Sequence, residues 1–175
     1  KVNNKLEIDF EWKKIPAGKF LMGSEFTPIP GDAPDPEYFG VSKHGANRPA
    51  DFDNEIPQHK ILLEKYRISK TPVTNAQYEI FTKATGYPVP GHWPEGVVTS
   101  ELANHPVVYV DWADVQAFCD WAGVALPTEP QWERAARGID GRIWPWGNFP
   151  PNKELANYGQ TDKTGRTNSV GFYPS

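Results

Sequence analysis

The stretch HPVVYVDWADVQAFCDWAGVALPTEPQWERAARG, from His105 to Gly138, decides the fold class because it specifies one strand and two helices in succession. The short apolar run Val107–Val110 is typical of a buried strand. Asp111 is a favourable N-cap and Gly123 a favourable stop for a helix over residues 112–122. The inward face of this helix is expected to carry Val115, Phe118, Cys119 and Ala122.

The second helix of the stretch has both ends marked. Thr128 is a favourable N-cap, Gln131 completes a capping box three residues later, and Gly138 ends the helix. Trp132, Ala135 and Ala136 fall on one helical face. We therefore expect the two alanines to permit close packing and Trp132 to fill the space beside them.

Elements upstream of this stretch are also marked. Residues 10–24 alternate apolar and polar side chains around Pro16-Ala17-Gly18, which predicts a β-hairpin. Residues 59–74 read as a strand whose apolar pattern shifts near Tyr66, so a bulge is expected there. Thr74 caps a helix over residues 75–84 that ends before Gly86 and turns Ala76, Tyr78 and Phe81 toward the core. Residues 25–58 are dense in Pro, Gly and Asp and predict a long loop with solvated carboxylates.

Composition and charge limit the classes of function. With 38% hydrophobic residues, 18 Pro, 15 Gly and 7 Trp in 175 residues, the chain is expected to form one soluble globular domain with many turns. The net charge is −4 and the longest basic cluster is Lys13-Lys14, which argues against a nucleic-acid partner. No apolar run approaches the ~20 residues of a membrane span, so no membrane partner is expected. No signal peptide is evident and the compartment stays open, with the cytoplasm as the default.

The order of motifs along the chain resembles that of the sulfatase-modifying or formylglycine-generating enzyme family. The motifs are IPAGKFLMGS, EIPQHKILLEKYRISKTPVTNAQYEIF, the stretch quoted first, WPWGN, AN and VGFYP. The resemblance implies an α+β, C-type-lectin-like fold with short helices, a small antiparallel sheet and much irregular loop. It also implies that residues 10–175 form one sulfatase-modifying-factor-like domain, preceded by a tail or linker over residues 1–9 and without the C-terminal part of the family domain.

The resemblance also bears on catalysis. Enzymes of the family carry, in a continuation beyond the point where this sequence stops, a pair of active-site cysteines that bind copper. This sequence has one cysteine, Cys119, which is expected to be buried on the apolar side of its helix. We therefore assign no catalytic residue, and we expect copper only if a continuation carries the cysteine pair.

The resemblance further implies a structural Ca²⁺ site in the C-terminal loop. The family's ligands map onto the Asn157 side chain, the Tyr158 carbonyl, the Asp162 side chain and the Thr164 carbonyl. Oxygen ligands from an irregular loop suit Ca²⁺. The gap between Asn157 and Asp162 is shorter than in the family pattern, and the alternative is a turn-rich loop without an ion.

Two tryptophans are candidate binding residues. Trp93 is the one most expected to be exposed and Trp146 lies in a Pro-rich loop, whereas Trp112, Trp121 and Trp132 are expected in the core. The leading hypothesis is a non-catalytic module that binds a protein or a small ligand, similar to the variable proteins of diversity-generating retroelements. The alternatives are the N-terminal part of a copper-dependent oxidase that converts a sulfatase cysteine to formylglycine, and a structural fragment that needs a complementary chain.

Overall fold

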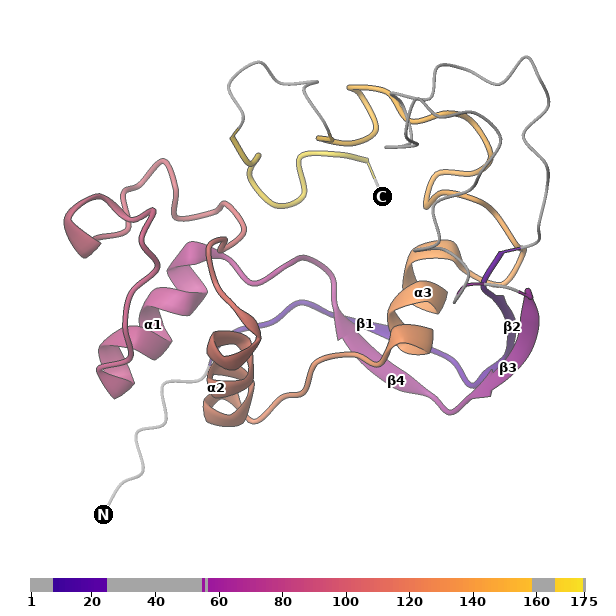
Figure 1. Ribbon diagram of the computed structural model, residues 1–175, viewed down its shortest axis with the longest axis horizontal. Helices are drawn as coiled ribbons and strands as arrows, with labels where there is room; N and C mark the ends of the chain where they lie inside the picture. Colours follow the sequence, from indigo (N-terminus) through magenta and orange to yellow (C-terminus); the bar gives the residue numbers. More distant parts are fainter. Residues whose placement is uncertain (1–7, 25–54, 56, 159–165, 175) are drawn as a thin grey trace.

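The computed structural model describes residues 8–24, 55, 57–158 and 166–174 of the chain. Most of the predicted loop over residues 25–58 lies outside these ranges. Four short strands and three α-helices are present in the described part (Figure 1). The helices and the antiparallel strand pairs confirm the predicted α+β class.

The four strands form one bent, two-stranded ribbon. Strand β1 (Trp12–Ile15) pairs antiparallel with β4 (Tyr66–Ser69), and β2 (Gly18–Met22) pairs antiparallel with β3 (His59–Leu63). The register is continuous, because Ile15 faces Tyr66 and Gly18 faces Leu63, with two residues on each strand between them. The predicted hairpin over residues 10–24 is therefore wrong: its two strands exist, but they run end to end.

The bend also explains the shift in apolar pattern near Tyr66. Phe20 and Met22 are buried in β2, whereas the less exposed position of β1 is Ile15, so the inward positions change parity across the bend. β3 and β4 change parity in the same way. A bulge would shift the register by one residue, and no such shift occurs, so the predicted bulge is wrong.

Helix α1 (Asn75–Thr85) follows the sequence prediction closely. Thr74 caps it, Gln77 completes the capping box, and Gly86 closes it in the left-handed conformation. Tyr78 and Phe81 are buried as expected, but Ala76 is exposed and Asn75 takes its place in the interior.

Helix α2 (Trp112–Ala122) begins after the N-cap Asp111 and ends at Gly123, as predicted. Phe118 and Cys119 are buried on its inward face, and Val115 and Ala122 pack beside them. The strand predicted over Val107–Val110 is absent from the structure. Tyr109 has φ +55°, which breaks an extended conformation. What remains is an isolated bridge between Thr74 and Pro106, with backbone bonds from Val107 N–H to Val73 O and from Asn75 N–H to His105 O, both at 2.9 Å.

Helix α3 (Glu129–Arg137) lies inside the bend of the ribbon (Figure 1). The Thr128 N–H donates to Oε1 of Gln131 at 2.9 Å, as the capping box predicts. The buried residue is Arg134, whose guanidinium donates to the Gly18 and Pro16 carbonyls, at 2.5 and 2.8 Å. Trp132 is 62% exposed, so the predicted packing of its ring is wrong. The capped helix therefore holds the bend through a buried cation.

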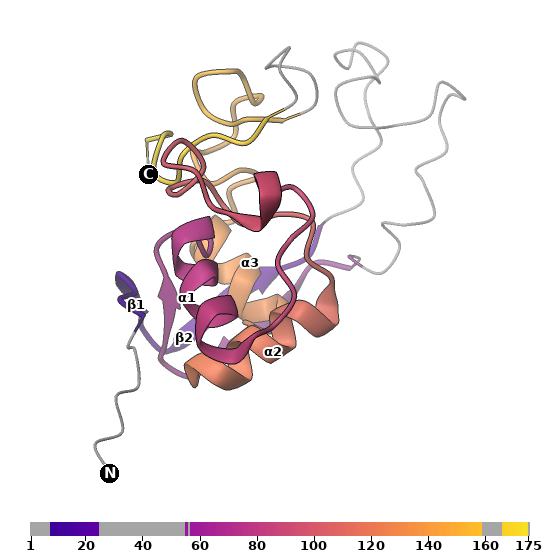
Figure 2. The ribbon, with the colours of Figure 1, turned by 90° about the vertical axis from the view of Figure 1, so that its left-hand side faces the viewer.

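The main core lies between α1 and α2, which run side by side in Figure 2. It consists of Tyr78, Phe81, Trp93, Phe118 and Cys119. The Tyr78 and Phe118 rings stack at 5.5 Å, and Trp121 packs against Phe81 and Phe118 as expected of a core tryptophan. Trp112, however, is 70% exposed. Ile8, the first described residue, and Phe10 pack against the same cluster.

Beyond α3 the chain has no further helix or named strand within the described residues. The final described segment returns to the first half through the Val170 N–H, which donates to the Asn104 carbonyl at 2.9 Å. Among the residues with described coordinates, no helix is long and apolar enough to cross a membrane.

Candidate functional site

A buried polar centre joins three segments at the start of α1. Asn75 is 1% exposed. Its Nδ2 donates to the carbonyls of Leu102 (2.9 Å) and His105 (3.1 Å), and its Oδ1 accepts from Trp93 Nε1 at 2.8 Å. Trp93 is 4% exposed, so the predicted exposure of this tryptophan is wrong, and its ring belongs to the core. Sequence reasoning missed Asn75 because an asparagine after a helix cap is ordinary.

His92 contacts the same asparagine. Its Nε2 lies 3.1 Å from Asn75 Oδ1, which can only accept, so Nε2 carries the proton. Nδ1 is then an acceptor, and it is buried with no hydrogen-bond partner among the residues that the structure describes. The ring of Tyr109, a strained residue with φ +55°, packs against the imidazole at 5.5 Å. Burial lowers the pKa of His92.

This geometry predicts a loss of stability in mild acid. A lowered pKa in the folded state means that the unfolded chain binds more protons as the pH falls through 6.5, the ordinary imidazole value. The contribution of neutral His92 to the free energy of unfolding is fully present above pH 6.5 and decreases as the pH falls toward the folded-state pKa. Urea unfolding at pH 7 and pH 5 checks this, and the non-titrating His92→Gln variant should show a smaller loss between the two. An equal loss in both proteins would assign the acid effect to other groups.

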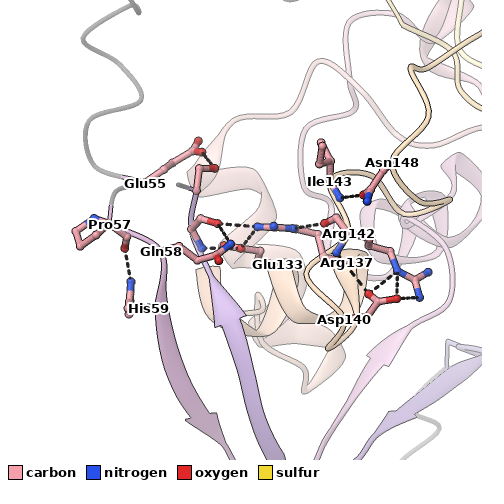
Figure 3. Close-up of polar contacts among 12 residues, drawn as sticks. Glu55, Pro57, Gln58, His59, Glu133, Arg137, Asp140, Arg142, Ile143 and Asn148 are labelled. Carbon is pink, nitrogen blue, oxygen red and sulfur yellow. Dashed lines mark hydrogen bonds and ion pairs between the residues drawn. The ribbon is translucent and has the colours of Figure 1, made fainter. Parts of the chain in front are cut away.

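A second polar cluster lies where the ribbon meets α3 and the loop after it (Figure 3). Glu133 Oε1 accepts from the Gly23 N–H at 2.8 Å and from Arg137 at 2.6 Å. Arg137 also donates to the carbonyls of Gly23 (2.9 Å) and Arg142 (2.7 Å). Because these hydrogen bonds link the end of β2, helix α3 and the loop after it, the cluster is suited to holding three chain segments together.

The loop after α3 carries a further ion pair. Arg142 forms hydrogen bonds with both carboxylate oxygens of Asp140, the closest at 2.8 Å. These bonds lower the pKa of Asp140 to about 2. The pair is exposed, so its contribution to stability is small.

Trp146 is half-buried and stacks on Trp144, with ring centroids 5.8 Å apart and planes 7° from parallel. Its indole N–H donates to the Phe149 carbonyl at 3.0 Å. Ile143 and Phe149 beside it are 60% and 75% exposed. The segment 143–149 therefore presents an apolar surface around Trp146.

The predicted calcium ligands are only partly within the described residues. The Asn157 side-chain N–H groups donate to the Arg166 carbonyl (2.8 Å) and to Asn168 Oδ1 (2.5 Å), which brings the two ends of this loop together. The Tyr158 hydroxyl donates to the Pro151 carbonyl at 2.9 Å. Asp162 and Thr164 lie outside the described residues.

The residues of this chain do not fit a copper site built from two cysteines. Cys119 is the only cysteine in the sequence, and it is 5% exposed within the aromatic core. Burial and the nearby Asp120 raise the pKa of its thiol, which disfavours the thiolate that a metal or a nucleophilic step requires. Within the described ranges, no group of three His, Cys, Asp or Glu side chains could hold a metal ion.

Comparison with known proteins gives a consistent family. The sequence model described as "Sulfatase-modifying factor enzyme 1-like domain" matches residues 11–175. A formylglycine-generating enzyme of Streptomyces coelicolor is 32% identical over 77% of this chain and 50% of its own length. One from Thermomonospora curvata is 34% identical over 77% of this chain and 51% of its own length.

Other relatives broaden this picture. A hercynine oxygenase of Mycolicibacterium smegmatis is 31% identical over 92% of this chain and 43% of its own length. The solved structure of PvdO from Pseudomonas aeruginosa matches with a TM-score of 0.61 and 23% identity, covering 93% of this chain and 62% of that one, and it supports the fold alone. The chain spans about half the length of the curated relatives it matches.

Proposed function

Because the chain belongs to the sulfatase-modifying factor enzyme 1-like family, we propose that residues 10–175 act as a binding and framework module of that family. The module holds a protein or a small ligand and has no reacting group of its own. The carrying observation is the state of Cys119, which is the only thiol, lies in the core and has a raised pKa.

The ligand surface in this proposal is the apolar segment around Trp146. Its stacked partner Trp144 and the hydrogen bond to Phe149 support a fixed orientation of the indole, while Ile143 and Phe149 offer exposed apolar area. Such a surface on an irregular loop could vary in sequence without disturbing the helices, as in the variable proteins of diversity-generating retroelements.

The alternative proposal is that these residues are the N-terminal part of an oxidase that converts a sulfatase cysteine to formylglycine. Relatives with that name are 32% and 34% identical, and this chain spans 50% and 51% of their lengths. A third candidate is a fragment that a complementary chain completes, which the exposure of Trp112 (70%), Trp132 (62%) and Phe172 (65%) favours.

An oxidation assay tests whether these residues alone carry a reacting group. Purified residues 1–175 are incubated with Cu⁺, O₂ and a cysteine-bearing sulfatase-type peptide, and formylglycine is measured by mass spectrometry. We expect no turnover above the copper-and-peptide background, because burial of Cys119 raises the pKa of its thiol and keeps the sulfur away from the peptide. The Cys119→Ala variant is the matched control. Turnover that disappears in this variant would make Cys119 catalytic and would rule out the non-catalytic module.

We also propose that Ca²⁺ binds the loop that begins at Asn157, with Tyr158, Asp162 and Thr164 as the other ligand residues. The support is that Nδ2 of Asn157 makes the two loop-closing bonds, whereas no hydrogen bond to its Oδ1 is present within the described residues. Ca²⁺ at 100 times its Kd should stabilise the fold by about 2.7 kcal/mol, and thus raise Tm by several degrees.

Thermal unfolding with EDTA and with Ca²⁺ tests this proposal. Asn157→Ala should remove the response to Ca²⁺. Asn148→Ala is a suitable control, because Asn148 also closes a loop, accepting from the Ile143 N–H at 2.9 Å, but is no proposed ligand. A Ca²⁺ response that survives in Asn157→Ala would exclude this ligand set.

A further inference from the structure

The bent ribbon has an outer face, turned away from α3. The inner face is fixed by two contacts with the helix side: the Tyr66 hydroxyl donates to the Gln131 carbonyl at 2.6 Å, and Phe20 is buried with Arg134 stacked 6.0 Å from its ring. Side chains alternate between the faces of a strand. The outer positions are therefore Trp12, Lys14, Arg67 and Ser69 in one half and Lys19, Leu21, Lys60 and Leu62 in the other. Of these, Leu21 is half-buried, with its side chain near Gly141 of the loop after α3.

Like charges lie together on this face. Lys14 is directly opposite Arg67 in the β1–β4 register, and Lys19 is diagonal to Lys60 in the β2–β3 register. All four side chains belong to exposed residues, and no carboxylate occupies any of the eight outer positions. Like charges directly opposite each other destabilise a strand pair, so their presence here disfavours the free ribbon.

The cations are also left without counter-charges. Within the described residues, the side chains of Lys14, Lys19 and Lys60 make no hydrogen bond or ion pair. The Arg67 side chain only stacks over the Trp12 ring, at 5.5 Å. The neighbouring lysines outside the face behave differently, since Lys13 and Lys70 both pair with Glu11. The four outer cations are therefore available to an external anion.

We propose that this outer face docks an acidic segment of a partner polypeptide. The two cation pairs are separated by five residues along the strand, at most roughly 17 Å at the usual rise, which an extended peptide of about six residues spans. Trp12 (37% exposed) and Leu62 (64% exposed) flank the cations and offer apolar contacts that a peptide side chain can use. The proposal is independent of the surface around Trp146 and of any catalysis.

Other polyanions fit this face less well. Four cations on a chain of net charge −4 give little long-range attraction for nucleic acid, whose binding relies on many phosphate contacts. An anionic membrane favours basic residues beside a continuous apolar surface that can insert, whereas Trp12 and Leu62 lie in different halves of the bent ribbon with Lys14 and Arg67 between them. A short acidic segment needs only local complementarity.

The test uses a variant that should gain stability while it loses binding. In Lys14→Glu/Lys60→Glu, one member of each cation pair is reversed, which creates opposite-charge cross-strand pairs with Arg67 and Lys19. The matched control is Lys153→Glu/Arg166→Glu, which makes the same change in net charge at exposed positions elsewhere. The probe is a fluorescein-labelled ten-residue peptide with six glutamates and two leucines, followed by anisotropy at low and moderate salt.

We expect binding to the unmodified chain that weakens with salt, at least a tenfold loss of affinity in the ribbon variant, and less than a threefold loss in the control. The Tm of the ribbon variant should be unchanged or higher, which separates loss of docking from loss of fold. Equal losses of affinity in both variants would show that binding depends only on the net charge of the chain, and would overturn the proposal. Tighter binding of oligo-dT or of phosphatidylserine vesicles than of the peptide would overturn it as well.

Discussion

Replacing Asn75 with alanine is expected to lower the free energy of unfolding by about 4 kcal/mol, because it leaves the ring N–H groups of Trp93 and His92 without an acceptor. The indole N–H of Trp93 loses its acceptor at 2.8 Å and Nε2 of His92 loses its acceptor at 3.1 Å. The carbonyls of Leu102 and His105 keep backbone donors, the N–H groups of His105 and Asn75, both at 2.9 Å. Each orphaned buried group costs about 1–3 kcal/mol. Urea unfolding followed by tryptophan fluorescence measures the loss, and Trp93 itself should report the changed environment.

Gln116→Ala serves as the control for this prediction. Gln116 donates to Asp120 at 2.9 Å across an exposed helix face, so its removal strands no buried group and should change stability by less than about 0.5 kcal/mol. Asn75→Asp keeps the shape but places a carboxylate against two carbonyl oxygens, and should be at least as harmful as alanine. A loss below 1 kcal/mol in Asn75→Ala would show that water can replace the asparagine.

Gly23→Ala is expected to lower the free energy of unfolding by about 3 kcal/mol or more. Gly23 has φ +83°, and an added Cβ would lie 2.3 Å from the Glu55 carbonyl oxygen. Backbone has to move, and the movement disturbs the hydrogen bonds that Gly23 makes with Glu133 and Arg137. Thermal and urea unfolding of the variant measure the combined effect.

Gly86→Ala isolates the steric part of this loss. Gly86 has a similar φ of +74°, but an added Cβ would meet no atom within 4 Å. Only the conformational penalty of a left-handed residue remains, about 1–2 kcal/mol. If the two variants lost the same free energy of unfolding, the close approach of the Glu55 carbonyl to Gly23 would contribute nothing to the loss.

The helices could be predicted because their signals are local. Thr74, Asp111 and Thr128 cap their helices as predicted, and Thr128 forms the predicted capping box with Gln131. The glycines at the C-terminal ends depend only on the conformation of one residue. Such helix signals involve only residues within one turn of each other, so a short stretch of sequence contains all of them.

The pairing of the strands could not be predicted in the same way. Residues 10–24 have the alternation and the turn residues of a hairpin, but Arg134 holds the carbonyls of Pro16 and Gly18 from a distance of more than 110 residues. This contact keeps the turn open as a bend. Nothing within residues 10–24 encodes a donor that far along the chain.

The burial of the tryptophans also depends on contacts that are distant in sequence. Its position on a helix predicted Trp132 inside and its position in a loop predicted Trp93 outside, and both predictions are wrong. Trp93 is buried because Asn75 supplies an acceptor for its N–H, a partner 18 residues away. Trp132 is displaced because the inward position goes to Arg134, the cation that the bend requires. In both cases a polar residue, Asn75 or Arg134, decides which tryptophan is buried, and the periodicity of apolar residues does not reveal that residue.

Cys119 gives the molecule a built-in reporter of transient opening. Cys119 carries the only thiol of the sequence, is 5% exposed and packs between α1 and α2. A thiol reagent can therefore reach it only after those two helices have separated. The rate of alkylation under native conditions therefore follows the small population of molecules whose helical half has opened. With one reactive group there is no second signal to subtract, so this half can be followed separately from the ribbon, which contains no cysteine.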